Sequence, residues 1–373
     1  MKESIFVFGR MLDDPLCAEV IGVQPVWQTA VLRDHAICSG AALADGAGLC
    51  PSAGARVEGR LLLLEDEALS RLEVFLGLRA ARPCTVEVTG DSGPRSARAY
   101  LPDTICAGQT WSFAAWQNRF ARAEVLAWRE MLALVVTHPP EVLQARHPMA
   151  MSHAASSLRA QAEPVAASLR GRWQRDDVSP VHETRPYAWY FAVAEDDLQF
   201  RRFDHTWSAT VKRAALVMSD AVTVLPYDPR RDVVMLVEQF RYGPWLRGAQ
   251  NPWSLEPIAG RVDPGERPEE AALREAQEEA RVTLAPESLL PVANCYPSPG
   301  AITEFLYQFV ALCDLPDGSE GVAGLESEAE DIRSHVVPFA RLMDMVARGE
   351  VQNGPLVLTA YWLALNRERL QEL

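Results

Sequence analysis

The chain has 373 residues, 48% of them hydrophobic, which is enough apolar material for two domains of ordinary size. Its formal net charge of −14 disfavours a general nucleic-acid or anionic-membrane surface, because both would repel an acidic protein. Seven cysteines without a CxxC pair predict a reduced, cytoplasmic protein rather than a disulfide framework or a zinc site. The start, MKESIFVFGR, lacks a signal-peptide pattern, and no run approaches the ~20 apolar residues of a membrane span.

The first 135 residues have the pattern of a compact α+β domain. Short apolar runs predict strands, and two longer amphipathic runs predict helices. The second of these helices carries aromatic and aliphatic residues at helical spacing. We expect strands at 5–9, 57–64, 85–88 and 97–101, and helices at 65–78 and 113–134.

The rest of the chain divides into two regions. Residues 136–185 are rich in alanine, arginine, proline and histidine with weak periodicity, which predicts a linker with some helix. Residues 186–373 alternate strands and helices in mixed order, which is typical of an α/β/α sandwich. In that region we expect strands at 187–207, 220–228, 232–241 and 305–312, a strand–turn–helix unit at 255–282, and two amphipathic helices at the end.

The segment from Gly260 to Val282 carries the clearest chemical signal. It reads as a strand, a turn at Pro264–Gly265 and a helix that begins near Pro268. Three glutamates on that helix are spaced three and four residues apart, so they share one face: Glu275, Glu278 and Glu279. Such carboxylates repel one another unless a hard cation binds them. A solvated acidic helix face is the ordinary alternative for this run taken alone.

The spacing of the whole segment resembles the Nudix box. Every fixed position of that motif matches except the last glycine, where Arg281 stands. That glycine ends the helix in a left-handed conformation, so the departure affects the cap rather than the carboxylates. The matching residues are Gly260, Glu266, Arg274, Glu275, Glu278 and Glu279.

The resemblance implies a role for each of these residues. Glu275, Glu278 and Glu279 would hold Mg²⁺, with Mn²⁺ as a possible substitute and the backbone carbonyl of Ala259 as a further ligand. Glu266 and Arg274 would brace the loop and helix. Metal ions in such a site neutralise diphosphate charge and activate a water.

The flanking sequence resembles the ADP-ribose pyrophosphatases of the Nudix superfamily. WSLEPIAG, YPSPGAITEFLYQFVAL and GLESEAEDIRSHVV carry this likeness. In that family a proline about fifteen residues after the box marks ADP-ribose specificity. Pro297 and Pro299 lie fifteen and seventeen residues after Val282, and the tripeptide Ser298–Pro299–Gly300 favours Pro299. An ordinary proline–glycine loop is the alternative.

The same resemblance points to further site residues. The acidic loop 326–331 matches the position of the catalytic base, with Glu328 preferred over Glu330, and Glu279 completes the expected catalytic set. Arg241 matches an arginine that contacts substrate phosphate. A solvated loop and a surface salt bridge are the respective alternatives. The family also implies a homodimer in which an aromatic residue from the N-terminal strands stacks on adenine.

The N-terminal region resembles another family. FVFGRML, at residues 6–12, is similar to the opening of the gamma-glutamylcyclotransferase-like fold. The catalytic glutamate position of that fold holds Leu76 here, so we expect a domain without that activity. The combined architecture resembles bacterial Nudix proteins associated with tellurite resistance.

These observations predict an α+β chain with a gamma-glutamylcyclotransferase-like domain at 1–135, a linker at 136–185 and a Nudix α/β/α sandwich at 186–373. The expected reaction is Mg²⁺-dependent hydrolysis of ADP-ribose to AMP and ribose 5-phosphate. One alternative is hydrolysis of another nucleoside diphosphate derivative, such as a nucleotide sugar. Another is a sensor that binds ADP-ribose without cleaving it, which the intact glutamates disfavour. A fourth hypothesis makes the N-terminal domain the active part, as a gamma-glutamyl enzyme, and Leu76 disfavours it.

Overall fold

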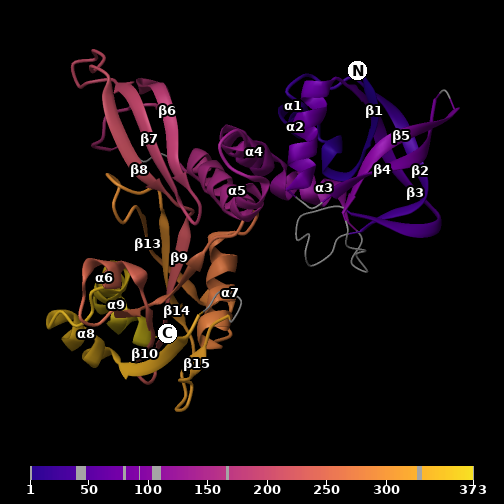
Figure 1. Ribbon diagram of the computed structural model, residues 1–373. Helices are drawn as coiled ribbons and strands as arrows, with labels where there is room; N and C mark the ends of the chain where they lie inside the picture. Colours follow the sequence, from indigo (N-terminus) through magenta and orange to yellow (C-terminus); the bar gives the residue numbers. More distant parts are fainter. Residues whose placement is uncertain are drawn as a thin grey trace. The chain divides into compact units, whose positions relative to one another are not determined.

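The structure of the protein is a computed structural model (Figure 1). It describes residues 2–38, 48–78, 81–91, 93–102, 111–164, 168–325 and 330–372. The chain divides into two compact units. Unit 1 comprises Met1–Val165 and Ala188–Tyr190, and unit 2 comprises Ala166–Tyr187 and Phe191–Leu373. Within the described ranges, every helix is too short or too polar to span a lipid bilayer.

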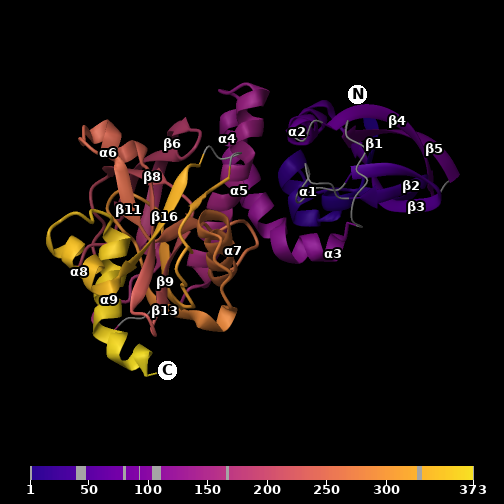
Figure 2. The same ribbon diagram turned by 90° about the horizontal axis from the view of Figure 1, so that it is seen from below.

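Unit 1 contains a closed β-barrel (Figure 2). Strand β1 pairs antiparallel with β3 and parallel with β5, which closes the barrel. Apolar side chains such as Phe6, Leu32 and Val88 fill its interior. In barrel order the strands are β1 (Glu3–Val7), β3 (Gly48–Leu64), β2 (Trp27–Cys38), β4 (Ala81–Gly90) and β5 (Gly93–Pro102).

Helices complete unit 1. Asp13 caps α1 (Asp14–Ile21) by accepting the Leu16 N–H at 3.0 Å, which satisfies one of the free donors at the helix start. Phe75 of α2 and Trp128 of α4 pack edge to face with ring centroids 5.0 Å apart. The remaining helices are α2 (Asp66–Gly77), α3 (Phe113–Trp116), α4 (Arg122–Val135) and α5 (Pro140–Ala162), with a 3₁₀ turn at Gly9–Leu12 and a π turn at Gln117–Ala121.

The region expected to be a linker contains more regular structure than the sequence indicates. Helix α5 runs through Pro140–Ala162, packs on α4 and belongs to unit 1. Its buried face consists largely of small or polar residues, including Arg146 and His153. The hydrophobic pattern of the segment is therefore weak although the helix is well packed. Strand β6 (Val178–Ala188) also begins inside the expected linker.

A mixed β-sheet forms the centre of unit 2. Strand β14 runs parallel to β9, and the other strand pairs are antiparallel. The main path is β13 (Leu289–Cys295), β14 (Leu306–Leu312), β9 (Ala221–Asp228), β10 (Val233–Phe240), β16 (Ile332–Pro338) and β15 (Val322–Ala323), with β11 (Trp253–Glu256) paired to β10 and β12 (Ile258–Arg261) paired to β9.

Helices cover both faces of this sheet, which gives the expected α/β/α layers. Alternate residues of β10 point to opposite cores, as strand geometry requires. Met235 and Val237 lie in the core under α7 (Pro268–Ala280). Val234 and Leu236 lie in the core under α8 (Phe339–Ala347) and α9 (Gly354–Gln371).

Two smaller elements complete unit 2. Strands β6, β7 (Ala192–Phe200) and β8 (Val211–Val217) form a separate three-stranded sheet. The single-turn helix α6 (Tyr242–Arg247) follows β10. The end of β8 reaches the loop after β13, where the Leu216 N–H donates to Ala301 O at 2.8 Å.

The cysteines differ in part from the expectation of a fully reduced protein. Cys50 is disulfide-bonded. Among the described residues Cys17, Cys84, Cys295 and Cys313 are free thiols, and burial raises the pKa of Cys17 and Cys313 to about 12.

Candidate active site

Helix α7 displays the acidic residues, and its two ends follow from local sequence. Pro268 stands in the first turn, and the Glu270 carboxylate accepts the Arg267 N–H at 2.9 Å. At the other end Arg281 adopts a left-handed conformation with φ 56°, and its N–H bonds to Ala276 O and Gln277 O. The expected left-handed cap therefore forms with arginine in place of glycine.

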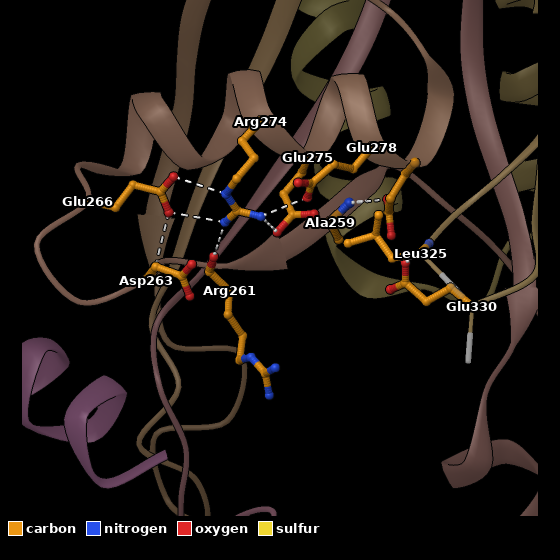
Figure 3. Close-up of polar contacts among 10 residues, drawn as sticks. Ala259, Arg261, Asp263, Glu266, Arg274, Glu275, Glu278, Leu325 and Glu330 are labelled. Atoms are coloured by element: carbon orange, nitrogen blue, oxygen red, sulfur yellow. Dashed lines mark hydrogen bonds and ion pairs between the residues drawn. The ribbon is translucent and has the colours of Figure 1, made fainter. Parts of the chain in front are cut away.

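Arg274 joins the helix to the turn before it (Figure 3). Its guanidinium donates from Nε to Glu266 Oε1 and from Nη2 to Oε2, both at 3.0 Å, and from Nη2 to Arg261 O at 2.9 Å. Glu266 in turn accepts the Asp263 N–H at 3.1 Å. Burial alone would lower the pKa of Arg274, but Glu266 and Glu275 raise it above its usual value. These contacts hold the turn against the helix.

The other edge of Arg274 faces two carboxylates of the helix. Its Nη1 lies 2.6 Å from Glu275 Oε1 and 3.0 Å from Glu278 Oε2. One guanidinium therefore contacts three carboxylates, those of Glu266, Glu275 and Glu278, which leaves this cluster with net negative charge.

The next residue, Glu279, is the most deeply placed of the acidic set. Its side chain is buried, with 2% of the residue exposed, and it accepts the Ala259 N–H at 3.0 Å. Burial raises the pKa of Glu279 to about 8, and the charges of Glu275 and Glu330 add to the effect. Burial likewise raises the pKa of Glu275 to about 7, against the influence of Arg274. Both carboxylates would be ionised more readily if a cation were near.

Gly260 allows β12 to lie against this acidic face. A β-carbon at Gly260 would stand 1.9 Å from Glu275 Oε1 and 2.0 Å from its carboxyl carbon. Any side chain here would displace Glu275. The glycine is therefore required by the close approach of the strand to the helix.

The donor chemistry of this face suits a hard divalent cation. It offers carboxylate oxygens from Glu275, Glu278 and Glu279, which is the kind of ligand that Mg²⁺ and Mn²⁺ prefer. As placed, the described acidic, histidine and cysteine side chains form no group of three or more with the geometry to hold a metal ion. Two of these carboxylates, those of Glu275 and Glu278, are paired with Arg274.

The loop before β16 approaches the acidic helix. The Gly324 N–H donates to Glu278 O at 3.3 Å. Glu330 closes the loop base, because its Oε2 accepts the Leu325 N–H at 3.1 Å and its own N–H donates to Leu325 O at 3.2 Å (Figure 3). Its charge reaches Glu275 and Glu279, whose pKa values it helps to raise. Glu328, the preferred base candidate, lies outside the described residues.

The expected substrate residues lie on two separate segments. Arg241 follows β10 and pairs with Glu256, with Nη2 2.6 Å from Oε2. Ser298, Pro299 and Gly300 form an exposed turn in which the Ser298 carbonyl accepts the N–H groups of Ala301 and Ile302 at 3.0 and 3.1 Å. The same turn is held to β8 through Leu216.

Comparison with known proteins identifies the family. The model of the NUDIX domain matches residues 218–358. A curated ADP-ribose pyrophosphatase from Haemophilus influenzae is 34% identical over 202 residues, which make up 54% of this chain and 92% of that protein. The chain belongs to the Nudix family.

Further curated relatives differ in the substrate that their names state. The ADP-ribose pyrophosphatase of Escherichia coli strain K12 is 33% identical over 197 residues, covering 53% of this chain and 92% of that protein. A GDP-mannose pyrophosphatase of Escherichia coli O1:K1 / APEC is 30% identical over 155 residues, covering 42% of this chain and 78% of that protein. The protein is a Nudix hydrolase, and Nudix ADP-ribose pyrophosphatases are divalent-metal dependent.

Two carboxylates near this Nudix box were not expected from the sequence. Glu256 holds Arg241, and Glu304 lies near enough to Asp220 and Arg241 for both charges to act on it. Burial is the largest influence and raises the pKa of Glu304. The only sequence signals were a lone acid before IAGR and one four residues beyond Gly300, which spacing alone does not distinguish from surface acids.

Proposed function

We propose that the protein hydrolyses ADP-ribose to AMP and ribose 5-phosphate, with Mg²⁺ as the divalent ion. The observation that carries this proposal is the acidic face of α7 in a chain that spans 92% of a curated ADP-ribose pyrophosphatase. Addition of one water across the diphosphate yields the two phosphate monoesters. Mn²⁺ is expected to substitute, because it takes the same oxygen ligands.

We assign the metal ligands to Glu275, Glu278 and Glu279, together with the carbonyl of Ala259. A divalent ion in this place would neutralise diphosphate charge and make an attacking water more acidic. Gly260 lets the strand approach, and Glu266 with Arg274 braces the turn and helix, as their contacts support. Burial and mutual repulsion disfavour the ionised form of these carboxylates. A bound cation would offset both effects, which explains why the helix carries them.

We assign the proton acceptor for the attacking water to the acidic loop, where Glu328 is preferred and Glu330 is the other candidate. Glu279 completes the proposed catalytic set. The contact of this loop with the acidic helix, where the Gly324 N–H donates to Glu278 O, supports the assignment. A weak base suffices where a cation has lowered the pKa of the water.

Substrate contacts are assigned to Arg241 and to the exposed turn Ser298–Pro299–Gly300. A guanidinium matches two phosphate oxygens, which suits Arg241 to the diphosphate. The turn would distinguish ADP-ribose from other nucleoside diphosphate derivatives. A nucleotide sugar is the second candidate substrate, because one of the relatives is a GDP-mannose pyrophosphatase.

The remaining proposals concern the whole chain. We assign unit 1 to the gamma-glutamylcyclotransferase-like fold without that activity, since Leu76 of α2 occupies the expected glutamate position. We also propose a cytoplasmic homodimer related to the tellurite-resistance Nudix proteins. A full-length chain that releases 5-oxoproline from a gamma-glutamyl dipeptide would contradict the assignment of unit 1.

A comparison of kcat/KM for different substrates tests the proposed activity. AMP release from ADP-ribose should exceed GMP release from GDP-mannose, and product release from other nucleotide sugars, by at least tenfold in kcat/KM. A preference for a nucleotide sugar would make that compound the substrate. ADP-ribose that binds without any AMP release would favour the sensor.

A further inference from the structure

Arg241 and Glu256 meet because two neighbouring strands fix their backbones. Arg241 directly follows β10, and its N–H donates to Pro252 O at 2.9 Å. Glu256 ends β11, which pairs antiparallel with β10 and places Glu256 opposite Val237. The two side chains are therefore brought together from residues fifteen positions apart.

The contact is a side-on ion pair with several hydrogen bonds. Arg241 donates from Nε to both oxygens of Glu256 at 3.1 Å and from Nη2 to Oε2 at 2.6 Å. This geometry fixes the plane of the guanidinium as well as its position. The Glu256 side chain is 6% exposed and that of Arg241 is 41% exposed. A buried carboxylate thus holds a cation that reaches solvent.

We propose that Glu256 is a positioning residue that holds the guanidinium of Arg241 ready for the substrate diphosphate. The inference rests on the proposed function, because it takes a diphosphate as the anion that Arg241 meets. It adds a residue that contacts neither the substrate nor the metal but acts through Arg241.

A double-mutant cycle with ADP-ribose and Mg²⁺ tests the proposal. Glu256→Gln should lower kcat/KM by about 10- to 100-fold, mainly through a higher KM, because a misdirected group loses its contact. Glu256→Asp keeps the charge and should restore part of the loss. In an Arg241→Ala background, Glu256→Gln should have little further effect, since the residue acts through Arg241.

Asp232→Asn provides a matched control at the opposite end of β10. Asp232 accepts from Arg367 Nε at 2.7 Å and Nη2 at 2.6 Å, which is the same type of pair outside the site. This variant should lower the melting temperature and leave KM unchanged. If Glu256→Gln behaves in the same way, or if its effect adds fully to that of Arg241→Ala, Glu256 is structural and the proposal is wrong.

Calorimetric titration with ADP and Mg²⁺ separates this inference from the proposed function. If the wild type does not hydrolyse ADP-ribose, the proposed function fails. Weaker ADP binding by Glu256→Gln than by the wild type, with recovery in Glu256→Asp, would still support positioning. Equal ADP binding by both proteins, or none by the wild type, would overturn it.

Discussion

Two clusters of buried charge in this protein are organised in opposite ways. In unit 1, Glu124 of α4 lies 2.8 Å from Arg10, with side chains 0% and 6% exposed. Glu130 of the same helix lies 2.5 Å from Arg146. Each carboxylate faces its own guanidinium, so each of these two pairs is balanced in charge.

The acidic face of α7 in unit 2 lacks this balance. Arg274 is shared among several glutamates, and Glu279 accepts a backbone N–H but makes no ion pair with any described residue. The pairs of unit 1 are neutralised within the chain, whereas on the proposed function the excess charge of α7 is offset by a bound divalent ion. Variants of the two clusters should therefore have different consequences.

The largest expected effect is on catalysis, from Glu279→Gln. Loss of this buried charge should lower kcat/KM for ADP-ribose by roughly 10³-fold, the scale of removing a main electrostatic stabiliser. Glu269→Gln on the exposed first turn of α7 is the control and should remain active. Activity of Glu279→Gln near the wild-type value would remove the distinction between the two clusters.

Gly260→Ala should come next, because it disturbs the acidic face without altering its charge. The added β-carbon would displace Glu275 from its position 1.9 Å away. We expect kcat/KM to fall about 10²-fold through misplacement. Gly243→Ala is the control, since no atom lies within 4 Å of its β-carbon position. Equal activity of the two variants would show that β12 does not constrain the site.

The balanced cluster should respond in stability instead. Glu124→Gln leaves Arg10 buried without its carboxylate, which should lower the free energy of unfolding of unit 1 by about 3–5 kcal/mol. Arg10→Met combined with Glu124→Leu should recover most of this in chemical denaturation. A single variant as stable as the wild type, or one whose loss Mg²⁺ reverses, would contradict the assignment of a purely internal pair.

The smallest effect concerns the end of α7. Arg281 is left-handed at φ 56°, a conformation that glycine adopts without strain. Arg281→Gly should stabilise unit 2 by about 1 kcal/mol and leave kcat/KM within twofold of the wild type. A loss of stability measured by thermal unfolding would mean that the arginine side chain makes a favourable contact that outweighs its strain.

The acidic helix could be predicted from the sequence because its chemistry lies on consecutive turns of one element. The spacing of Glu275, Glu278 and Glu279 fixes a shared face, and the left-handed position of Arg281 follows from the same motif. Glu256 could not be found in this way, because its contact with Arg241 depends on the register between β10 and β11. The sequence of helix α5 is typical of a linker with some helix, because buried alanine, serine, arginine and histidine give no apolar stripe.

The most direct test of the central claim is AMP release from ADP-ribose by full-length protein freed of metal with EDTA and then titrated with Mg²⁺. The account predicts no turnover without metal and a saturable return of activity as Mg²⁺ is added. Turnover in EDTA equal to that with Mg²⁺ would contradict the role of the acidic face. The absence of AMP at every Mg²⁺ concentration would contradict the proposed reaction itself.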